Sequence, residues 1–140
     1  MTIPPLLMIA EGRKPRLRKA QIPTQKEFIL QVTIADLLRK TARPEWRWTH
    51  FPAGELRSPA TGARLKRMGL RPGWPDFILL SPSATAHCLE LKRIGGRLYE
   101  EQSEFKLWAA RHGNPYCVAE TFDQAVQILR HWQAIIEVHT

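Results

Sequence analysis

Three residues in the middle of the sequence, Asp76, Glu90 and Lys92, have the chemistry to hold a metal ion and act on a phosphate. Two neighbouring carboxylates repel each other, and buried charges are costly unless they are paired or bound to a metal. Carboxylate, water and phosphate oxygens are the ligands that Mg²⁺ prefers. A lysine beside them can serve an attacking water or stabilise charge on the phosphate. The alternative is a turn aspartate and a solvated Glu-x-Lys pair.

Two short strands joined by a turn must position this trio. Residues 74–80 (WPDFILL) are an apolar run entered through a glycine and a proline, and residues 87–92 (HCLELK) alternate in polarity. The segment between them, residues 81–85 (SPSAT), has turn chemistry. The pattern predicts an antiparallel hairpin.

The hairpin explains how the trio would converge. Successive side chains on a strand point to opposite faces, so Glu90 and Lys92 share one face while Leu89 and Leu91 point to the other. Asp76 lies at the mouth of the first strand, where pairing would bring it beside Glu90.

Four segments of the chain resemble the VRR-NUC family, the virus-type replication and repair nucleases of the PD-(D/E)XK superfamily. They are residues 62–69 (GARLKRMG), 73–77 (GWPDF), 89–92 (LELK) and 96–102 (GRLYEEQ), in order and with family-like spacing. The resemblance covers roughly residues 24–133. It implies an α/β, restriction-endonuclease-like fold: a mixed sheet of about four strands flanked by helices, with an α-β-β-β-α-β core.

The resemblance also implies a role for each residue of the site. Asp76 and Glu90 would hold Mg²⁺ or Mn²⁺ together with the backbone carbonyl of Leu91. Lys92 would serve the attacking water, and Gln102 would orient the site. The catalytic set is thus Asp76, Glu90, Lys92 and Gln102.

Family members also carry an acid on the first helix that reaches the metal. Alignment on Phe28 places that position at Gln25, whereas the acid present is Glu27. Residues Thr24 and Glu27 fit a capping box, which gives Glu27 another role. The further metal ligand is therefore predicted as Gln25 or Glu27.

Periodicity predicts the remaining elements. The first helix runs from residue 24 to about 40, with Phe28, Val32, Ala35 and Leu38 as its buried stripe. His50 lies on the strand that follows, where it could approach the metal or simply pack. The other expected elements are a strand at 46–51, a short helix within 57–68, a helix at 99–112, a strand at 116–119 and a helix opened at 121.

Cationic side chains around the site could hold DNA phosphates, although an ordinary solvated helix face is the alternative for those on the short helix. The predicted nucleic-acid-binding residues are Arg57, Arg64, Lys66, Arg67, Arg93 and Arg97.

Length and charge indicate the number of domains and the kind of partner. The chain has 140 residues, enough for one domain, with a net charge of +8 and a pI near 10.1. Such a charge favours a polyanionic partner, nucleic acid first and an acidic membrane second.

Residues 1–22 are predicted as a flexible basic arm, either a phosphate-tracking tail or a solubilising leader, and residues 23–140 as the nuclease-like domain. No signal peptide or membrane span is recognisable, which predicts a cytoplasmic protein.

Taken with the resemblance, these features predict a metal-dependent nuclease that hydrolyses DNA phosphodiester bonds. Stand-alone family members act on branched or structured DNA and form homodimers, which suits replication, repair or recombination in a bacterial or phage-infected cell. The alternatives are a DNA-binding module of the same fold with weak or no cleavage, and a nuclease acting on linear DNA or RNA.

Overall fold

The computed structural model describes residues 25–52 and 58–137. The predicted arm, Thr24 of the capping box, the cation Arg57 and the side chain of Gln25 lie outside this description. The elements are α1 (Gln25–Thr41), β1 (Arg47–His50), α2 (Pro59–Arg67), β2 (Phe77–Leu80), β3 (Ala86–Leu91), α3 (Glu100–Arg111), β4 (Tyr116–Ala119) and α4 (Phe122–His131).

The four strands form one mixed sheet in the order β1-β2-β3-β4. Strands β1, β2 and β3 are antiparallel neighbours, whereas β4 runs parallel to β3. A parallel neighbour requires a crossover connection, and α3 provides it. Residue Leu80 pairs with Ala86 across the turn at 81–85, so the predicted hairpin and mixed sheet are confirmed.

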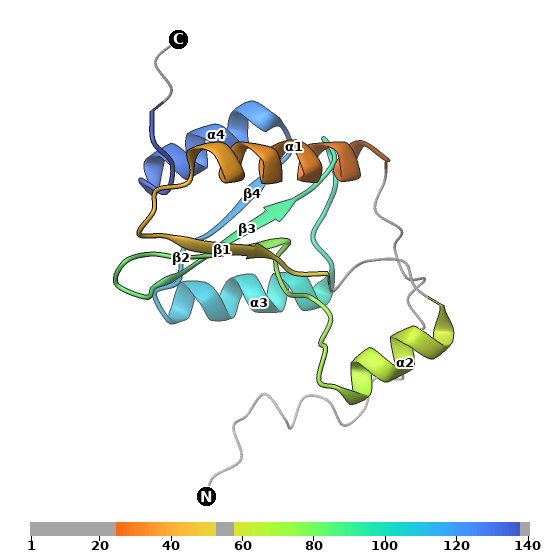
Figure 1. Cartoon of the computed structure of the whole chain (residues 1–140). Coiled ribbons are helices and arrows are strands. Elements are labelled where there is room, and N and C mark those ends of the chain that lie inside the picture. Colours follow the sequence, from red (N-terminus) through yellow and green to blue (C-terminus); the bar gives the residue numbers. More distant parts are fainter. Residues whose placement is uncertain (1–24, 53–57, 138–140) are drawn as a thin grey trace, which may run out of the picture.

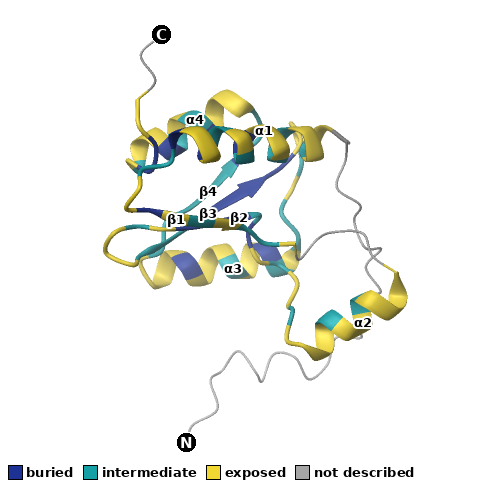
Figure 2. Ribbon diagram, in the orientation of Figure 1, coloured by how far each residue is buried: buried dark blue, intermediate teal, exposed yellow. Residues whose placement is uncertain are grey.

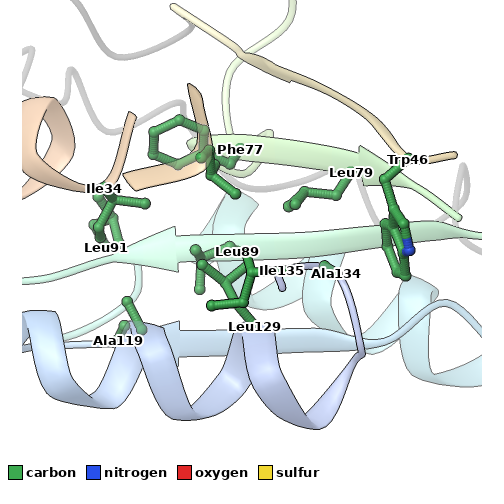
Figure 3. Close-up of a cluster of buried hydrophobic side chains, with 12 residues drawn as sticks. Ile34, Trp46, Phe77, Leu79, Leu89, Leu91, Ala119, Leu129, Ala134 and Ile135 are labelled. Atoms are coloured by element: carbon green, nitrogen blue, oxygen red, sulfur yellow. The ribbon is translucent and has the colours of Figure 1, made fainter. Parts of the chain in front are cut away.

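The helices cover both faces of the sheet, with α1 and α4 on one side and α3 on the other (Figure 1). The main hydrophobic core lies between the sheet and the α1–α4 layer (Figure 3). Strand β3 contributes Leu89 and Leu91 to it, so Glu90 and Lys92 face the α3 side as the alternation predicted. Its larger members include Ile34, Leu38, Phe77, Leu79, Leu89, Leu91, Leu129 and Ile135.

The predicted stripe on α1 was wrong at two positions. Phe28 and Val32 are 61% and 42% exposed, whereas Ile34 and Leu38 are buried, with Leu30 packed against them. This helix carries more than one apolar row at helical spacing, and the aliphatic row 30-34-38 is the one that meets the sheet. One turn before Leu30 on that row lies Glu27, so the acid of α1 belongs to the sheet-facing side.

The two rows can be told apart by stability. Ile34→Ala should lower the free energy of unfolding by about 2–5 kcal/mol, because it empties a fully buried site. Phe28→Ala should change it by no more than about 0.5 kcal/mol. Urea unfolding of both variants measures the difference, and a larger loss for Phe28→Ala would contradict the assigned row.

Helix α2 differs from the other helices because none of its residues is buried. It stands away from the sheet, and its residues are exposed or half-buried (Figures 1 and 2). The hydroxyl of Ser58 caps it by accepting the Thr61 N–H at 3.2 Å, so α2 begins at Pro59, within the segment where a short helix was expected. No helix in the described part of the chain is long and apolar enough to span a membrane.

Candidate active site

Asp76 is fixed from two sides at the end of the sheet. Its Oδ2 accepts the backbone N–H of Leu91 at 2.8 Å, which ties it to the end of β3. On the β1 side its carbonyl accepts the Phe51 N–H at 2.8 Å and lies 2.8 Å from His50 Nδ1. The sequence left open whether His50 approaches the site, and in the structure it supports the backbone of Asp76.

The loop before Asp76 packs against the start of α3, and Gly73 makes this approach possible. A Cβ at Gly73 would lie 2.5 Å from the Cβ of Glu101, and its φ of +87° also favours glycine. The ring of Trp74 stacks on Phe51 at 5.2 Å. The GWPD motif, which leads into β2, therefore packs against α3. Helix α3 is the one that carries Gln102.

Glu90 is 2% exposed and is held by Gln102. The amide Nε2 of Gln102 donates to Glu90 Oε1 at 2.7 Å, while its Oε1 accepts the N–H of Tyr99 at 2.9 Å. The helix cap thus fixes the orientation of the amide, so that its NH₂ group faces Glu90. The other oxygen, Glu90 Oε2, is buried and has no hydrogen-bond partner among the described residues.

Lys92 is also buried, at 6% exposure, and lies close to Glu90. Its Nζ is 3.6 Å from Glu90 Oε1 and 4.4 Å from the centre of the Tyr99 ring. A cation over an aromatic face is attracted by the ring quadrupole, so Tyr99 helps to hold the ammonium. This role of Tyr99 was not predicted from the sequence, where the available signal was an aromatic residue three positions before Gln102.

Burial shifts the pKa of both carboxylates toward their protonated forms, and the charge of Asp76 adds to the shift at Glu90. The pKa of Glu90 rises from 4.5 to about 9, chiefly through burial and then through the negative charge of Asp76, while Lys92 opposes the shift. Burial also raises the pKa of Asp76, against the Leu91 N–H and the Lys92 charge. A buried carboxylate pair of this kind is strongly biased toward binding either a proton or a metal cation.

The acid of the first helix lies at the same end of β3 but makes a different contact. Glu27 Oε1 accepts the backbone N–H of Arg93, the residue after Lys92, at 3.1 Å. Within residues 25–52 and 58–137, no group of three or more His, Cys, Asp or Glu side chains is placed to hold a metal. Glu27 thus contacts the backbone next to Lys92, while Asp76 and Glu90 lie close enough for the charge of Asp76 to raise the pKa of Glu90.

This contact gives a prediction for Glu27. Glu27→Gln keeps an oxygen acceptor for the Arg93 N–H, so the free energy of unfolding should change by well under about 1 kcal/mol. Glu27→Ala removes the acceptor and should lower the free energy of unfolding by about 0.5–1.5 kcal/mol. Urea unfolding measures both variants. A melting temperature that rises with Mg²⁺ in wild type but not in Glu27→Gln would instead make Glu27 a metal ligand.

The described cations predicted to contact nucleic acid are all exposed. Three lie on α2 and two on the loop between β3 and α3. Both segments lead to the same end of the sheet. The segment after α2 enters β2 at Asp76, and in the antiparallel pair the start of β2 lies beside the end of β3. The residues are Arg64, Lys66, Arg67, Arg93 and Arg97.

The architecture and the placement of the carboxylates at the strand ends define a restriction-endonuclease-like α/β fold. Among solved structures, the chain is similar to one titled "VRR_NUC domain", with a TM-score of 0.53 and 17% sequence identity. The match covers 76% of this chain and 97% of that one, which confirms the expected fold. No protein-family model matches the sequence, and no curated protein matches it significantly.

Proposed function

We propose that this protein is a metal-dependent nuclease that hydrolyses phosphodiester bonds in DNA. The observation that carries the proposal is the convergence of two buried carboxylates, Asp76 and Glu90, with the buried ammonium of Lys92 at one end of the sheet. Burying like charges together destabilises the protein unless a bound cation or a proton neutralises them. The similarity to a VRR_NUC domain structure supports the same assignment.

The residues present fit a Mg²⁺ or Mn²⁺ ion. Glu90 Oε2 is an unpartnered buried oxygen, and Asp76 supplies a second carboxylate. The N–H and C=O of a strand residue point to the same side, so the carbonyl of Leu91 is directed toward Asp76 together with its N–H. These three oxygens would hold the ion. When bound, a divalent metal supplies Lewis acidity at the phosphate and neutralises the carboxylate pair.

The other side chains have roles that follow from their contacts. Lys92 places a positive charge beside the carboxylates, where it can orient the attacking water and stabilise charge on the phosphate. Gln102 holds Glu90 Oε1 and so leaves Oε2 available for the metal. Tyr99 keeps the Lys92 ammonium in place.

The positive surface suits a nucleic-acid backbone. None of the residues of helix α2 is buried, and the helix carries three cations, as expected of a surface helix that contacts phosphates. From the sequence resemblance we further propose branched or structured DNA as the substrate, a homodimer as the active form, and a role in replication, repair or recombination.

Cleavage of a substrate panel tests the proposal. Full-length protein is incubated with junction, flap, linear duplex and RNA substrates, each with Mg²⁺, Mn²⁺ or a chelator. We expect metal-dependent cleavage of DNA, fastest on the branched forms. DNA binding without cleavage in either metal would contradict the nuclease and favour a binding module. Equal rates on linear DNA or RNA would contradict the proposed substrate shape.

A further inference from the structure

A pocket of about 740 Å³ opens beside the catalytic lysine, between the N-terminal half of α1, the loop after β3 and the start of α4. Its lining includes Lys92 and Arg93 together with Lys26. Its volume lies in the range of ligand-binding pockets. Lys92 belongs to this lining and its ammonium lies 3.6 Å from Glu90 Oε1, so the pocket lies next to the carboxylate site, on the α1–α4 side of the sheet.

The pocket is lined by apolar side chains that the fold leaves uncovered. Ile29, Ile94 and Phe122 are 55%, 78% and 37% exposed, and they come from three different segments. Convergent exposed apolar groups mark binding sites more often than chance. An aromatic ring flanked by aliphatic side chains is a surface on which a nucleic-acid base stacks.

The charges of the pocket suit a phosphate. Its two acids, Glu27 and Glu120, accept backbone N–H groups of the loop, from Arg93 at 3.1 Å and from Gly95 at 2.7 Å. They thereby fix the loop that forms one wall. The lining cations Lys26 and Arg93 are exposed and can contact a nucleic-acid backbone.

We propose that this pocket receives one unpaired nucleotide next to the scissile phosphate, with its base against Phe122 and its phosphate near Lys26 and Arg93. A base within a duplex is stacked and paired, and taking it out of the stack is costly unless it is already unpaired. The preferred substrate is therefore DNA with an unpaired nucleotide at the cleavage position. This inference rests on the proposed nuclease function.

Three duplexes of one sequence test the pocket. The first is fully paired, the second has one unpaired adenine, and the third has an abasic residue at that position. Full-length protein is assayed for cleavage with Mg²⁺ or Mn²⁺, and for binding by fluorescence anisotropy without divalent metal. We expect the unpaired adenine to be preferred over the abasic residue by at least about fivefold, the scale of base stacking on an aromatic ring.

Variants of Phe122 show whether the ring causes the preference. Phe122→Leu and Phe122→Ala should lose the preference and treat the abasic duplex as wild type does, whereas Phe122→Trp should keep it. The matched control is Leu107→Ala, which changes an exposed apolar residue on α3 that does not line the pocket. Melting curves confirm that each variant is folded, and the leucine variant keeps an apolar group if the alanine variant is unstable.

The outcomes separate the pocket from the nuclease. If all three duplexes are cleaved equally, or if Phe122→Leu keeps the preference, the pocket proposal is overturned while the nuclease stands. If nothing is cleaved but binding still depends on the base and on Phe122, the pocket stands and the nuclease falls. If Phe122→Ala changes the molar mass of the particle and leaves base preference intact, the pocket is a contact between copies and the proposal is wrong.

Discussion

Asp76→Asn and Lys92→Met are each expected to lower the cleavage rate by about a hundredfold or more, while DNA affinity stays within about threefold of wild type. Asparagine keeps an oxygen for the Leu91 N–H but removes the charge that a metal needs. Methionine keeps the stem of Lys92 beside Tyr99 and removes the ammonium. Single-turnover cleavage at saturating protein measures the chemical step, and fluorescence anisotropy measures binding.

The complementary control removes the cations of α2. Replacing Arg64, Lys66 and Arg67 together by alanine should weaken binding and flatten the slope of log affinity against log salt by up to roughly 0.9 per lost phosphate contact. Cleavage at saturating protein should be nearly unchanged, because these exposed residues lie outside the carboxylate site. Wild-type cleavage by Asp76→Asn would remove the basis for the site assignment.

Glu90→Gln should abolish cleavage and at the same time stabilise the metal-free protein at neutral and alkaline pH. The raised pKa of Glu90 determines whether stability rises or falls with pH. Below pH 4.5 the residue is protonated in both the folded and the unfolded states, so it contributes no difference. Between pH 4.5 and about 9 the unfolded chain releases the proton that the folded protein retains. The stability of the metal-free wild type therefore falls as the pH rises through this window.

Glutamine cannot ionise and still accepts the Gln102 amide, so it should remove most of this pH dependence. We expect its melting temperature to exceed that of wild type by at least about 3 °C at pH 8 in a chelator, a shift that corresponds to roughly 1 kcal/mol for a chain of this size. Near pH 4.5 the two proteins should melt alike. Adding Mg²⁺ should stabilise wild type and leave Glu90→Gln unchanged. A less stable Glu90→Gln protein at pH 8 would show that Glu90 is ionised and well paired in the fold.

Most of the fold follows from local sequence patterns that are each compatible with only one secondary structure. Strand β3 alternates without ambiguity, so the sequence by itself placed Glu90 and Lys92 on one face and Leu89 and Leu91 on the other. The turn at 81–85 has few alternatives to a hairpin, and it brings the first strand beside the second. Asp76, Glu90 and Lys92 were therefore predictable as a group, whereas Gln102 came from the family resemblance. The structure places all four together.

Only the tertiary structure decided which side of α1 is buried. The helix carries Phe28, Ile29 and Val32 as well as Leu30 and Ile34, so helical periodicity is satisfied by more than one row. Packing against the sheet selected the row that includes Leu30 and Ile34, and that choice carries Glu27 to Arg93.

The same holds for contacts between segments distant in sequence. The ammonium of Lys92 meets the ring of Tyr99 because the loop after β3 turns back across the end of the sheet. Glu27 and Glu120 meet that loop from α1 and from the end of β4. No local propensity encodes these approaches, because they depend on how helices and strands pack against one another and not on the period of any one of them.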